Sequence, residues 1–326
     1  MLDQYGRKID YMRISVTERC NLRCRYCMPE AGIEKQGCKD MLSYEEILRL
    51  CRIFVGLGIR KIKITGGEPL VRVGVCGLIR KIKQIPGIEQ VTLTTNGVLL
   101  AELAEDLIAA GIDGINISLD TVNEDKFKEI TRHSGLKRVL AGIQCLLAKN
   151  YHNIKINCVP LAEINGDQIA DIAAFAKDQP IAVRFIELMP VGCGTDYTAI
   201  SQEQVRHILE STYGKLQPYD GQLGNGPAEY YVLPHFQGKI GFINAISHKF
   251  CNSCNRIRLT ANGFLKLCLQ YSLGVDLKSL LRSPMSDAAL QKLIEKHIYE
   301  KPQEHHFHDE SVAALRDVRK MFQVGG

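Results

Sequence analysis

Short runs rich in β-branched residues alternate with longer amphipathic stretches through residues 1–190, and this rhythm constrains the fold of the chain. Ser43 and Glu46 have capping-box spacing at the start of one amphipathic stretch, and Gly111 is placed to end another. Strands that alternate with helices of this length indicate a parallel α/β fold, either doubly wound or barrel-like. The expected strands are residues 12–17, 61–65, 91–96, 114–119, 153–159 and 181–188.

The rhythm changes after residue 190. Residues 238–247 and 256–269 have the pattern of antiparallel strands, and the second segment carries Asn262-Gly263, a strong hairpin signal. Antiparallel pairing of this kind does not continue a βαβ series. We therefore expect a different architecture in this part of the chain.

Two helices are expected near the end, over residues 276–282 and 286–298. We predict two regions, 1–190 and 191–326. The smaller second region is expected to pack on the α/β body.

Composition excludes several classes of protein. Apolar residues make up 45% of the chain, and no apolar run is long enough to span a membrane. The N-terminal segment is polar and lacks the apolar stretch of a secretory signal, so we predict a cytoplasmic protein. The formal net charge of +5 suits an anionic small molecule and is too weak to indicate nucleic-acid binding.

Polar and glycine-rich segments follow the predicted strands. A cysteine triplet begins after the first strand, Gly66-Gly67 follow the second, and Asn96-Gly97 close the third. Ser118 lies at the end of the fourth strand. Parallel α/β folds place their active sites at the carboxyl ends of strands, so we predict an active site there.

The first cysteine triplet is Cys20, Cys24 and Cys27, with C-x3-C-x2-C spacing. This is neither the paired C-x2-C of a zinc finger nor the run of a four-cysteine ferredoxin. Three thiolates would leave one iron of a [4Fe–4S] cluster open to a small molecule. A structural zinc site with a distant fourth ligand is the alternative.

The second triplet is Cys251, Cys254 and Cys268, and its spacing alone favours zinc and an iron–sulfur cluster equally. Arg256 and Arg258 follow on the next expected strand, where residues two apart share a face. Paired guanidinium groups match phosphate oxygens. An anion site beside the second triplet is therefore predicted.

The first triplet, with Tyr26 before its last cysteine, resembles the C-x3-C-x-aromatic-C signature of the radical S-adenosylmethionine (SAM) superfamily. Residues 66–69 resemble the GGEP motif of that superfamily. The resemblance implies that SAM chelates the open iron. It also implies that SAM cleavage yields a 5′-deoxyadenosyl radical, and that the protein positions this cofactor chemistry.

The pattern FCNSCNRIRLT, with both triplets and a terminal diglycine in the same order, resembles the GTP 3′,8-cyclase family of molybdenum cofactor biosynthesis over the whole chain. The resemblance implies a partial (β/α)6 TIM-type barrel whose open side is closed by a C-terminal α+β region. It implies two [4Fe–4S] clusters, one binding SAM and the other binding the guanine of GTP. The radical would remove the 3′ hydrogen of GTP, and the C3′ radical would attack C8.

The family resemblance also assigns roles to individual residues. Gly67, Ser118 and Met189, with Tyr26, resemble SAM contacts, and Arg13, Arg256, Arg258, Gly325 and Gly326 resemble the catalytic set. Lys63 departs from the arginine that is usual in the family, so bidentate geometry is lost there. The residues that resemble GTP contacts are Arg13, Lys61, Lys63, Thr94, Lys155, Arg184, Arg256, Ile257 and Arg258.

The family implies an unidentified electron donor and a downstream cyclic pyranopterin monophosphate synthase, and a homodimer is possible. His305, His306 and His308 are interpreted as a surface cluster. Two other functions compete with this reading. One is a radical SAM enzyme that modifies peptides with an auxiliary cluster, and the other is a zinc or iron–sulfur module that binds nucleic acid.

Overall fold

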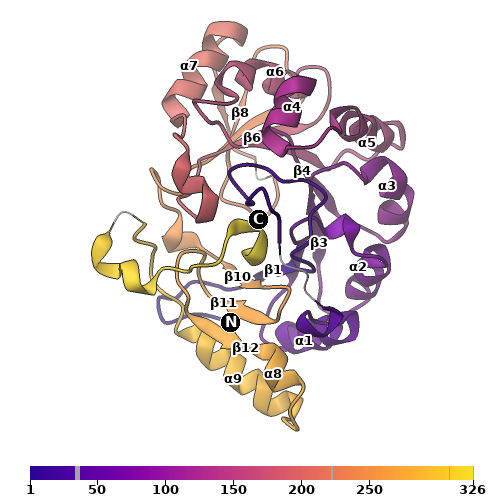
Figure 1. Ribbon diagram of the computed structural model, residues 1–326, viewed down its shortest axis with the longest axis vertical. Helices are drawn as coiled ribbons and strands as arrows, with labels where there is room; N and C mark the ends of the chain where they lie inside the picture. Colours follow the sequence, from indigo (N-terminus) through magenta and orange to yellow (C-terminus); the bar gives the residue numbers. More distant parts are fainter. Residues whose placement is uncertain (34–36, 222, 308, 326) are drawn as a thin grey trace.

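The computed structural model describes residues 1–33, 37–221, 223–307 and 309–325. Its strands form one twelve-stranded sheet in the order β12-β11-β10-β1-β2-β3-β4-β5-β6-β9-β8-β7. The sheet curves around a central space, and helices α1 to α5 lie along its outer side (Figure 1). The chain therefore has an α/β fold of the partial TIM-barrel type, as the sequence predicts.

The six predicted strands of residues 1–190 are confirmed, and they pair in parallel in sequence order. Each lies within two residues of its predicted limits. The strands are β1 (Tyr11–Ser15), β2 (Lys61–Thr65), β3 (Gln90–Thr95), β4 (Gly114–Ser118), β5 (Ile154–Cys158) and β6 (Ala182–Ile186).

The C-terminal half extends this sheet at both edges. β9 (Lys239–Ile243) pairs parallel with β6, and β10 (Arg256–Leu259) pairs parallel with β1, so the parallel part spans eight strands. The expectation of purely antiparallel pairing for residues 238–247 and 256–269 is therefore wrong on the barrel side. It holds on the outer side, where β9 pairs antiparallel with β8 (Glu229–Val232) and β10 with β11 (Phe264–Lys266). A hairpin turn in the sequence predicts only how a strand pairs with the next strand along the chain. It does not predict which strand pairs on the other side.

The sheet edges are short strands. β7 (Gln217–Tyr219) pairs antiparallel with β8, and β12 (Gly274–Asp276) pairs antiparallel with β11. The hairpin between β10 and β11 turns at Gly263, whose φ of +85° lies in the left-handed region that glycine tolerates. A Cβ there would lie 2.7 Å from the Lys278 Cβ. This turn sends β11 back along β10, so Cys268 after β11 returns toward the segment of Cys251 and Cys254 before β10.

The helix that follows Ser43 begins with the capping box that the sequence predicts. The Ser43 hydroxyl accepts a hydrogen bond from the Glu46 N–H at 3.1 Å, and the Glu46 carboxylate accepts one from the Ser43 N–H at 2.7 Å. The helices are α1 (Tyr44–Gly56), α2 (Val75–Lys83), α3 (Leu100–Ala109), α4 (Glu124–Thr131), α5 (Leu136–Ala148), α6 (Ile169–Ala173), α7 (Gln202–Tyr213), α8 (Leu277–Leu281), α9 (Asp287–Tyr299) and α10 (Met321–Val324). Among the described residues, none of the helices is both long and apolar enough to cross a membrane.

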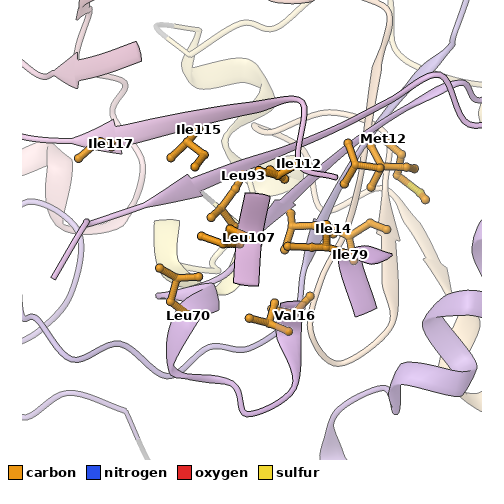
Figure 2. Close-up of a cluster of buried hydrophobic side chains, with 14 of the residues drawn as sticks. Met12, Ile14, Val16, Leu70, Ile79, Leu93, Leu107, Ile112, Ile115 and Ile117 are labelled. Atoms are coloured by element: carbon orange, nitrogen blue, oxygen red, sulfur yellow. The ribbon is translucent and has the colours of Figure 1, made fainter. Parts of the chain in front are cut away.

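The hydrophobic core lies between the strands and the outer helices. Met12 and Ile14 of β1 and Ile115 of β4 point to this side and meet Ile79 and Leu107 from the helices (Figure 2). Successive residues of a strand point to opposite faces, so the intervening residues face the inside of the barrel. The same alternation that builds the core therefore selects the side chains that line the barrel interior.

Leu107→Ala should destabilise the protein by about 3 kcal/mol, because the Leu107 side chain is fully buried between α3 and the sheet. The free energy of unfolding, measured by chemical denaturation, tests this. Val73→Ala is the matched control, since Val73 is 94% exposed. Equal stability of the two variants would contradict the core described here.

Candidate active site

A cavity of about 380 Å³ occupies the interior of the barrel. Every one of the eight parallel strands contributes to its wall, for example Arg13 from β1, Asn116 from β4 and Arg258 from β10. The wall residues on each strand are mostly two apart, as the alternation of strand side chains requires. The cavity is therefore a polar interior inside an apolar shell.

Both cysteine triplets and most of the predicted site residues line this one cavity. Lys61, Ile257 and Gly325 are not among its wall residues. The Lys61 ammonium pairs with the Asp10 carboxylate at 3.1 Å, and the Ile257 side chain is fully buried in the core. The predicted residues that line the cavity are Cys20, Cys24, Cys27, Cys251, Cys254, Cys268, Arg13, Tyr26, Lys63, Gly67, Thr94, Ser118, Lys155, Arg184, Met189, Arg256 and Arg258.

The loop that carries the first triplet is held against the loop that follows β2. The Gly67 N–H donates to the Thr17 carbonyl at 2.7 Å, and the Glu68 N–H donates to the Arg19 carbonyl at 2.8 Å. A Cβ on Gly67 would lie 2.5 Å from the carbonyl oxygens of Glu18 and Arg19. Glycine is thus required at this position for the close approach of two main chains.

Glu68 joins three segments at the same place. Its buried carboxylate accepts hydrogen bonds from the Thr95 hydroxyl at 2.7 Å, the Asn96 N–H at 2.7 Å and the Leu70 N–H at 3.0 Å. Burial raises the pKa of Glu68 to about 7, although these bonds oppose the shift. The Asn96 amide also donates to Asn21 at 2.8 Å, next to the first cysteine. Glu68 was missed in the sequence interpretation.

Tyr26 is fixed by the end of β4. Its hydroxyl donates to Asp120 at 2.6 Å, and the other Asp120 oxygen accepts the Val159 N–H at 2.9 Å. Ser118 and Met189 line the cavity along with Tyr26. Ser118 at the end of β4, Met189 after the end of β6 and Tyr26 on the cysteine loop are thus brought to one cavity.

The loop of the second triplet is held by Arg7, which the sequence interpretation missed. Its guanidinium donates to the Cys251 carbonyl at 2.9 Å and to the Pro302 carbonyl at 2.6 Å, and it pairs with Asp3 at 2.6 Å. Arg7 is buried. Because a buried guanidinium needs these partners, it ties the N-terminus, the second cysteine loop and residues 301–303 together.

The two triplets differ in their electrostatic surroundings. Burial raises the pKa of Cys20 to about 11 and that of Cys27 to about 12. Burial also raises the pKa of Cys254, but the nearby charges of Lys301 and Arg256 outweigh it and bring this pKa to about 7. The second triplet therefore lies in a more cationic environment than the first.

Within the described part of the chain, no group of three or more His, Cys, Asp or Glu side chains is close enough to hold a metal ion. A tetrahedral zinc site brings its sulfur ligands within roughly 3.8 Å of one another. In a [4Fe–4S] cluster each thiolate binds a different iron, so the thiolates stand farther apart. Two triplets that face one cavity fit a cluster better than a single ion.

Cationic side chains form a ridge inside the barrel, here called the basic wall: Arg13, Lys63, Lys155, Arg184, Arg256 and Arg258. Arg258, Arg13 and Lys63 occupy the same register on three adjacent strands. Burial, then Arg184 and Arg13, lower the pKa of Lys63 well below its usual range. Like charges side by side on a sheet are destabilising, so this arrangement favours an anionic ligand.

Two details of the basic wall support this interpretation. The Arg256 Nε is buried and has no hydrogen-bond partner among the described atoms, while its guanidinium lies 4.6 Å from the centre of the Phe250 ring. Arg184 donates to the Asn157 side chain at 2.6 and 2.9 Å. Asn157 and Asn116 were also missed, although strict polar–apolar alternation in the strand segments could have indicated them.

The C-terminal tail enters the same cavity. The Arg258 guanidinium donates to the Gly325 carbonyl at 2.5 Å. A Cβ on Gly325 would lie 2.5 Å from the Thr65 Oγ1, and its φ is +77°. Glycine is therefore required at this position. Gly326 lies outside the described residues.

His305 does not belong to a surface cluster, contrary to the interpretation of the sequence. It lines the cavity, and its Nε2 lies 2.6 Å from the Ala245 carbonyl, to which it donates. His306 is 40% exposed and His308 lies outside the described residues. Residues 305–308 therefore do not act as one patch.

Comparison with known proteins gives two family matches. Residues 14–176 match the radical SAM superfamily, and residues 181–307 match Molybdenum Cofactor Synthesis C. Proteins named GTP 3′,8-cyclase from Desulforamulus reducens, Clostridium perfringens strain 13 and Moorella thermoacetica are 46%, 44% and 42% identical to this chain. Each of these alignments covers 100% of both chains.

Solved structures with a similar fold include Streptococcus suis SuiB. SuiB bound to the precursor peptide SuiA superposes with a TM-score of 0.61 at 13% identity, covering 95% of this chain and 70% of that chain. SuiB bound to S-adenosylmethionine gives a TM-score of 0.60 at 14% identity, covering 95% and 71%. At this identity the likeness concerns the fold alone.

Inorganic triphosphate should bind the basic wall, with an affinity that falls as pH rises through about 8. Burial and Arg184 lower the pKa of Lys155 to about 8, so this side chain loses its charge there. The fall should reach about tenfold per pH unit, since one proton is coupled to binding. Calorimetric titration on both sides of this pH measures it.

Lys155→Arg is the control for this titration, because arginine keeps its charge and the ionisation of the ligand is common to both proteins. The variant should lose the part of the pH dependence that comes from residue 155. Equal pH slopes in the two proteins would exclude Lys155 from the anion site.

Proposed function

This chain belongs to the GTP 3′,8-cyclase family of the radical SAM superfamily, and we propose from this premise how its cavity carries out the reaction. The family makes it a radical SAM lyase of molybdenum cofactor biosynthesis, with SAM and an iron–sulfur cluster. The observation that carries the proposal is the meeting of both cysteine triplets and the basic wall in one cavity.

Two [4Fe–4S] clusters are proposed, one at each triplet. Cys20, Cys24 and Cys27 would hold the first. Cys251, Cys254 and Cys268 would hold the second. Each set supplies three thiolates and so leaves one iron for a small molecule, SAM at the first and the guanine of GTP at the second. When bound, the first cluster and SAM supply the radical that removes the 3′ hydrogen of GTP, after which C3′ bonds to C8.

The residues near the first triplet would position SAM. Gly67 holds the cysteine loop against the loop after β2, so the main chain around residues 66–68 faces the ligand. The Tyr26 ring, fixed through Asp120, covers the same side. Ser118 and Met189 complete this wall.

The basic wall would hold GTP. Its cations repel one another when no anion is present, and a triphosphate between them reverses that repulsion. Arg256 and Arg258 lie on β10, between Cys254 and Cys268 of the second triplet, so they join the guanine end of the site to the phosphate end. Thr94 adds a hydroxyl from β3.

Lys61 and Ile257 have weaker claims as GTP contacts, because neither side chain reaches the cavity. The Lys61 ammonium forms an ion pair with Asp10, whose carboxylate also accepts a hydrogen bond from the Asn255 amide at 2.7 Å. We therefore assign Lys61 to the support of the segment before β10. For Ile257 only the main chain is available to a ligand.

Peptide modification is the rival function within the superfamily. SuiB, whose structure was solved with a precursor peptide, shares the fold at 13% identity. The proteins that are 42–46% identical over their full length are named GTP 3′,8-cyclase. The basic wall also suits a triphosphate better than a peptide chain. We therefore do not propose peptide modification as the function.

The setting of the reaction is part of the proposal. The described cysteines occur as free thiols, which suits the reducing cytoplasm. A one-electron donor must supply the first cluster, and cyclic pyranopterin monophosphate synthase would use the product. A homodimer remains compatible with the fold.

Anaerobically reconstituted protein should convert GTP, SAM and a reductant into 5′-deoxyadenosine and a 3′,8-cyclised nucleotide in matching amounts. Both products are quantified by liquid chromatography with mass spectrometry. ATP in place of GTP is the control for the guanine site. Deoxyadenosine without any cyclised nucleotide would show that GTP is the wrong substrate.

Gly67→Ala should lose the iron of one cluster, because a methyl group there collides with two carbonyl oxygens of the first cysteine loop. Iron content after anaerobic reconstitution measures this. Gly77→Ala is the matched control, since a Cβ at Gly77 in α2 meets nothing within 4 Å. Full iron content in Gly67→Ala would contradict the role given to this loop.

A further inference from the structure

The C-terminal tail reaches the cavity by a defined route. The Leu315 carbonyl accepts the Ser272 N–H at 3.0 Å, and the Asp317 N–H donates to the Gln270 carbonyl at 2.6 Å. Arg316 forms an isolated antiparallel bridge with Tyr271 between them. Residues 315–317 are thus docked on residues 270–272, just after the last cysteine of the second triplet.

A buried ion pair lies at this docking point. The Lys266 ammonium on β11 contacts the Asp317 carboxylate, and their side chains are 0% and 3% exposed. Lys266 also donates to the Tyr271 carbonyl at 2.7 Å, and Asp317 accepts the Arg319 N–H at 2.9 Å. Both charges are fully partnered, which is the condition under which a buried pair is stable.

Lys266 is also the cross-strand partner of Arg258. Burial and then repulsion from Arg319 and Arg258 lower the pKa of Lys266. Asp317 supplies the opposite charge at this point. The same tail therefore contacts two adjacent strands. Asp317 forms an ion pair with Lys266 of β11, and the Gly325 carbonyl accepts a hydrogen bond from Arg258 of β10.

Between these two contacts the tail covers the first triplet. Phe322 and Val324 of α10 are 5% and 1% exposed, and Phe322 lines the cavity. Phe322 and Cys27 line the same cavity, and the Phe322 main chain lies beside the Cys27 thiol. The tail therefore touches the first triplet through Phe322 and the basic wall through Gly325, and its position depends on where Asp317 is held.

We propose that the Lys266–Asp317 ion pair is a latch that holds the C-terminal tail across both cysteine sites, and that Lys266 and Asp317 are positioning residues for Gly325 and Phe322. The proposal rests on the proposed function only in taking the cavity as the active site. The latch acts before GTP enters, because its contacts lie within the chain itself. It orients Arg258 through the Gly325 carbonyl rather than touching the substrate.

Limited trypsin digestion of the full-length, anaerobically reconstituted protein tests the latch without turnover. Trypsin can cleave after Arg319 and Lys320, and mass spectrometry follows the release of residues 321–326 relative to cleavage elsewhere. Asp317→Asn keeps the shape of the side chain and removes its charge, so release should become about tenfold faster or more. Glu102→Gln removes the exposed Arg138–Glu102 pair and should leave release unchanged.

Two further variants separate the latch from general loss of structure. Asp317→Glu keeps the charge, so its tail should be released as slowly as that of the unaltered protein. If only the shape of residue 317 mattered, Asp317→Glu would release the tail as fast as Asp317→Asn. Lys266→Met/Asp317→Asn removes both buried charges of the pair, and only Arg319, whose side chain is 26% exposed, loses its ion pair with Asp317. This double variant should therefore fold with a near-normal unfolding midpoint and still release the tail faster than the unaltered protein. Release at the unaltered rate in this double variant overturns the proposal, whatever the enzyme assay gives.

Kinetics supply a second readout. With the tail unlatched, kcat for GTP cyclisation should fall about tenfold while KM for SAM stays within about threefold, since none of the residues assigned to SAM (Tyr26, Gly67, Ser118 and Met189) lies on the tail. Equal loss in both parameters would assign the pair to the fold alone. If the chain fails to cyclise GTP at all, the digestion result still decides whether the Lys266–Asp317 pair holds the tail.

Discussion

The alternation of side chains along the parallel strands is the constraint on which the rest of the structure depends. On β1, Met12 and Ile14 pack against the outer helices while Arg13 faces the cavity. The strand register aligns Arg13 with Lys63 and Arg258, so main-chain pairing places three cationic side chains next to one another on adjacent strands. Folding alone gains nothing from that repulsion, so the basic wall is explained by the anion that we propose it binds.

The C-terminal half completes the site from both edges of the barrel. β9 adds to β6 and β10 adds to β1 in parallel, so segments far apart in sequence become walls of one interior. The turn at Gly263 then sends the chain back along β11, where Lys266 meets the tail. Arg7 ties the cysteine loop of this half to the N-terminus. The second cysteine site is therefore assembled from both ends of the chain.

The two cysteine sites are built differently for ligands of different charge. The first lies beside the buried carboxyl groups of Glu68 and Asp120, and burial keeps its thiols protonated until iron binds. The second lies beside Lys301 and Arg256, which favour a thiolate at Cys254 and an anion nearby. SAM carries a sulfonium cation and GTP carries a triphosphate, and the surroundings of each site suit the ligand proposed for it.

Local patterns in the sequence determined the six parallel strands, the α1 capping box, the hairpin turn and the two cysteine triplets, because each depends only on neighbouring residues. The resemblance of short motifs indicated which cationic residues belong to the site, and most of them line the cavity. Only the tertiary structure decided that β9 and β10 join the barrel in parallel, that Lys61 turns to Asp10, and that His305 faces inward. Glu68 lies in the GGEP-like segment, but its contacts with Thr95 and Asn96, like those of Arg7 and of the Lys266–Asp317 pair, join residues distant in sequence, which no periodicity or short motif predicts.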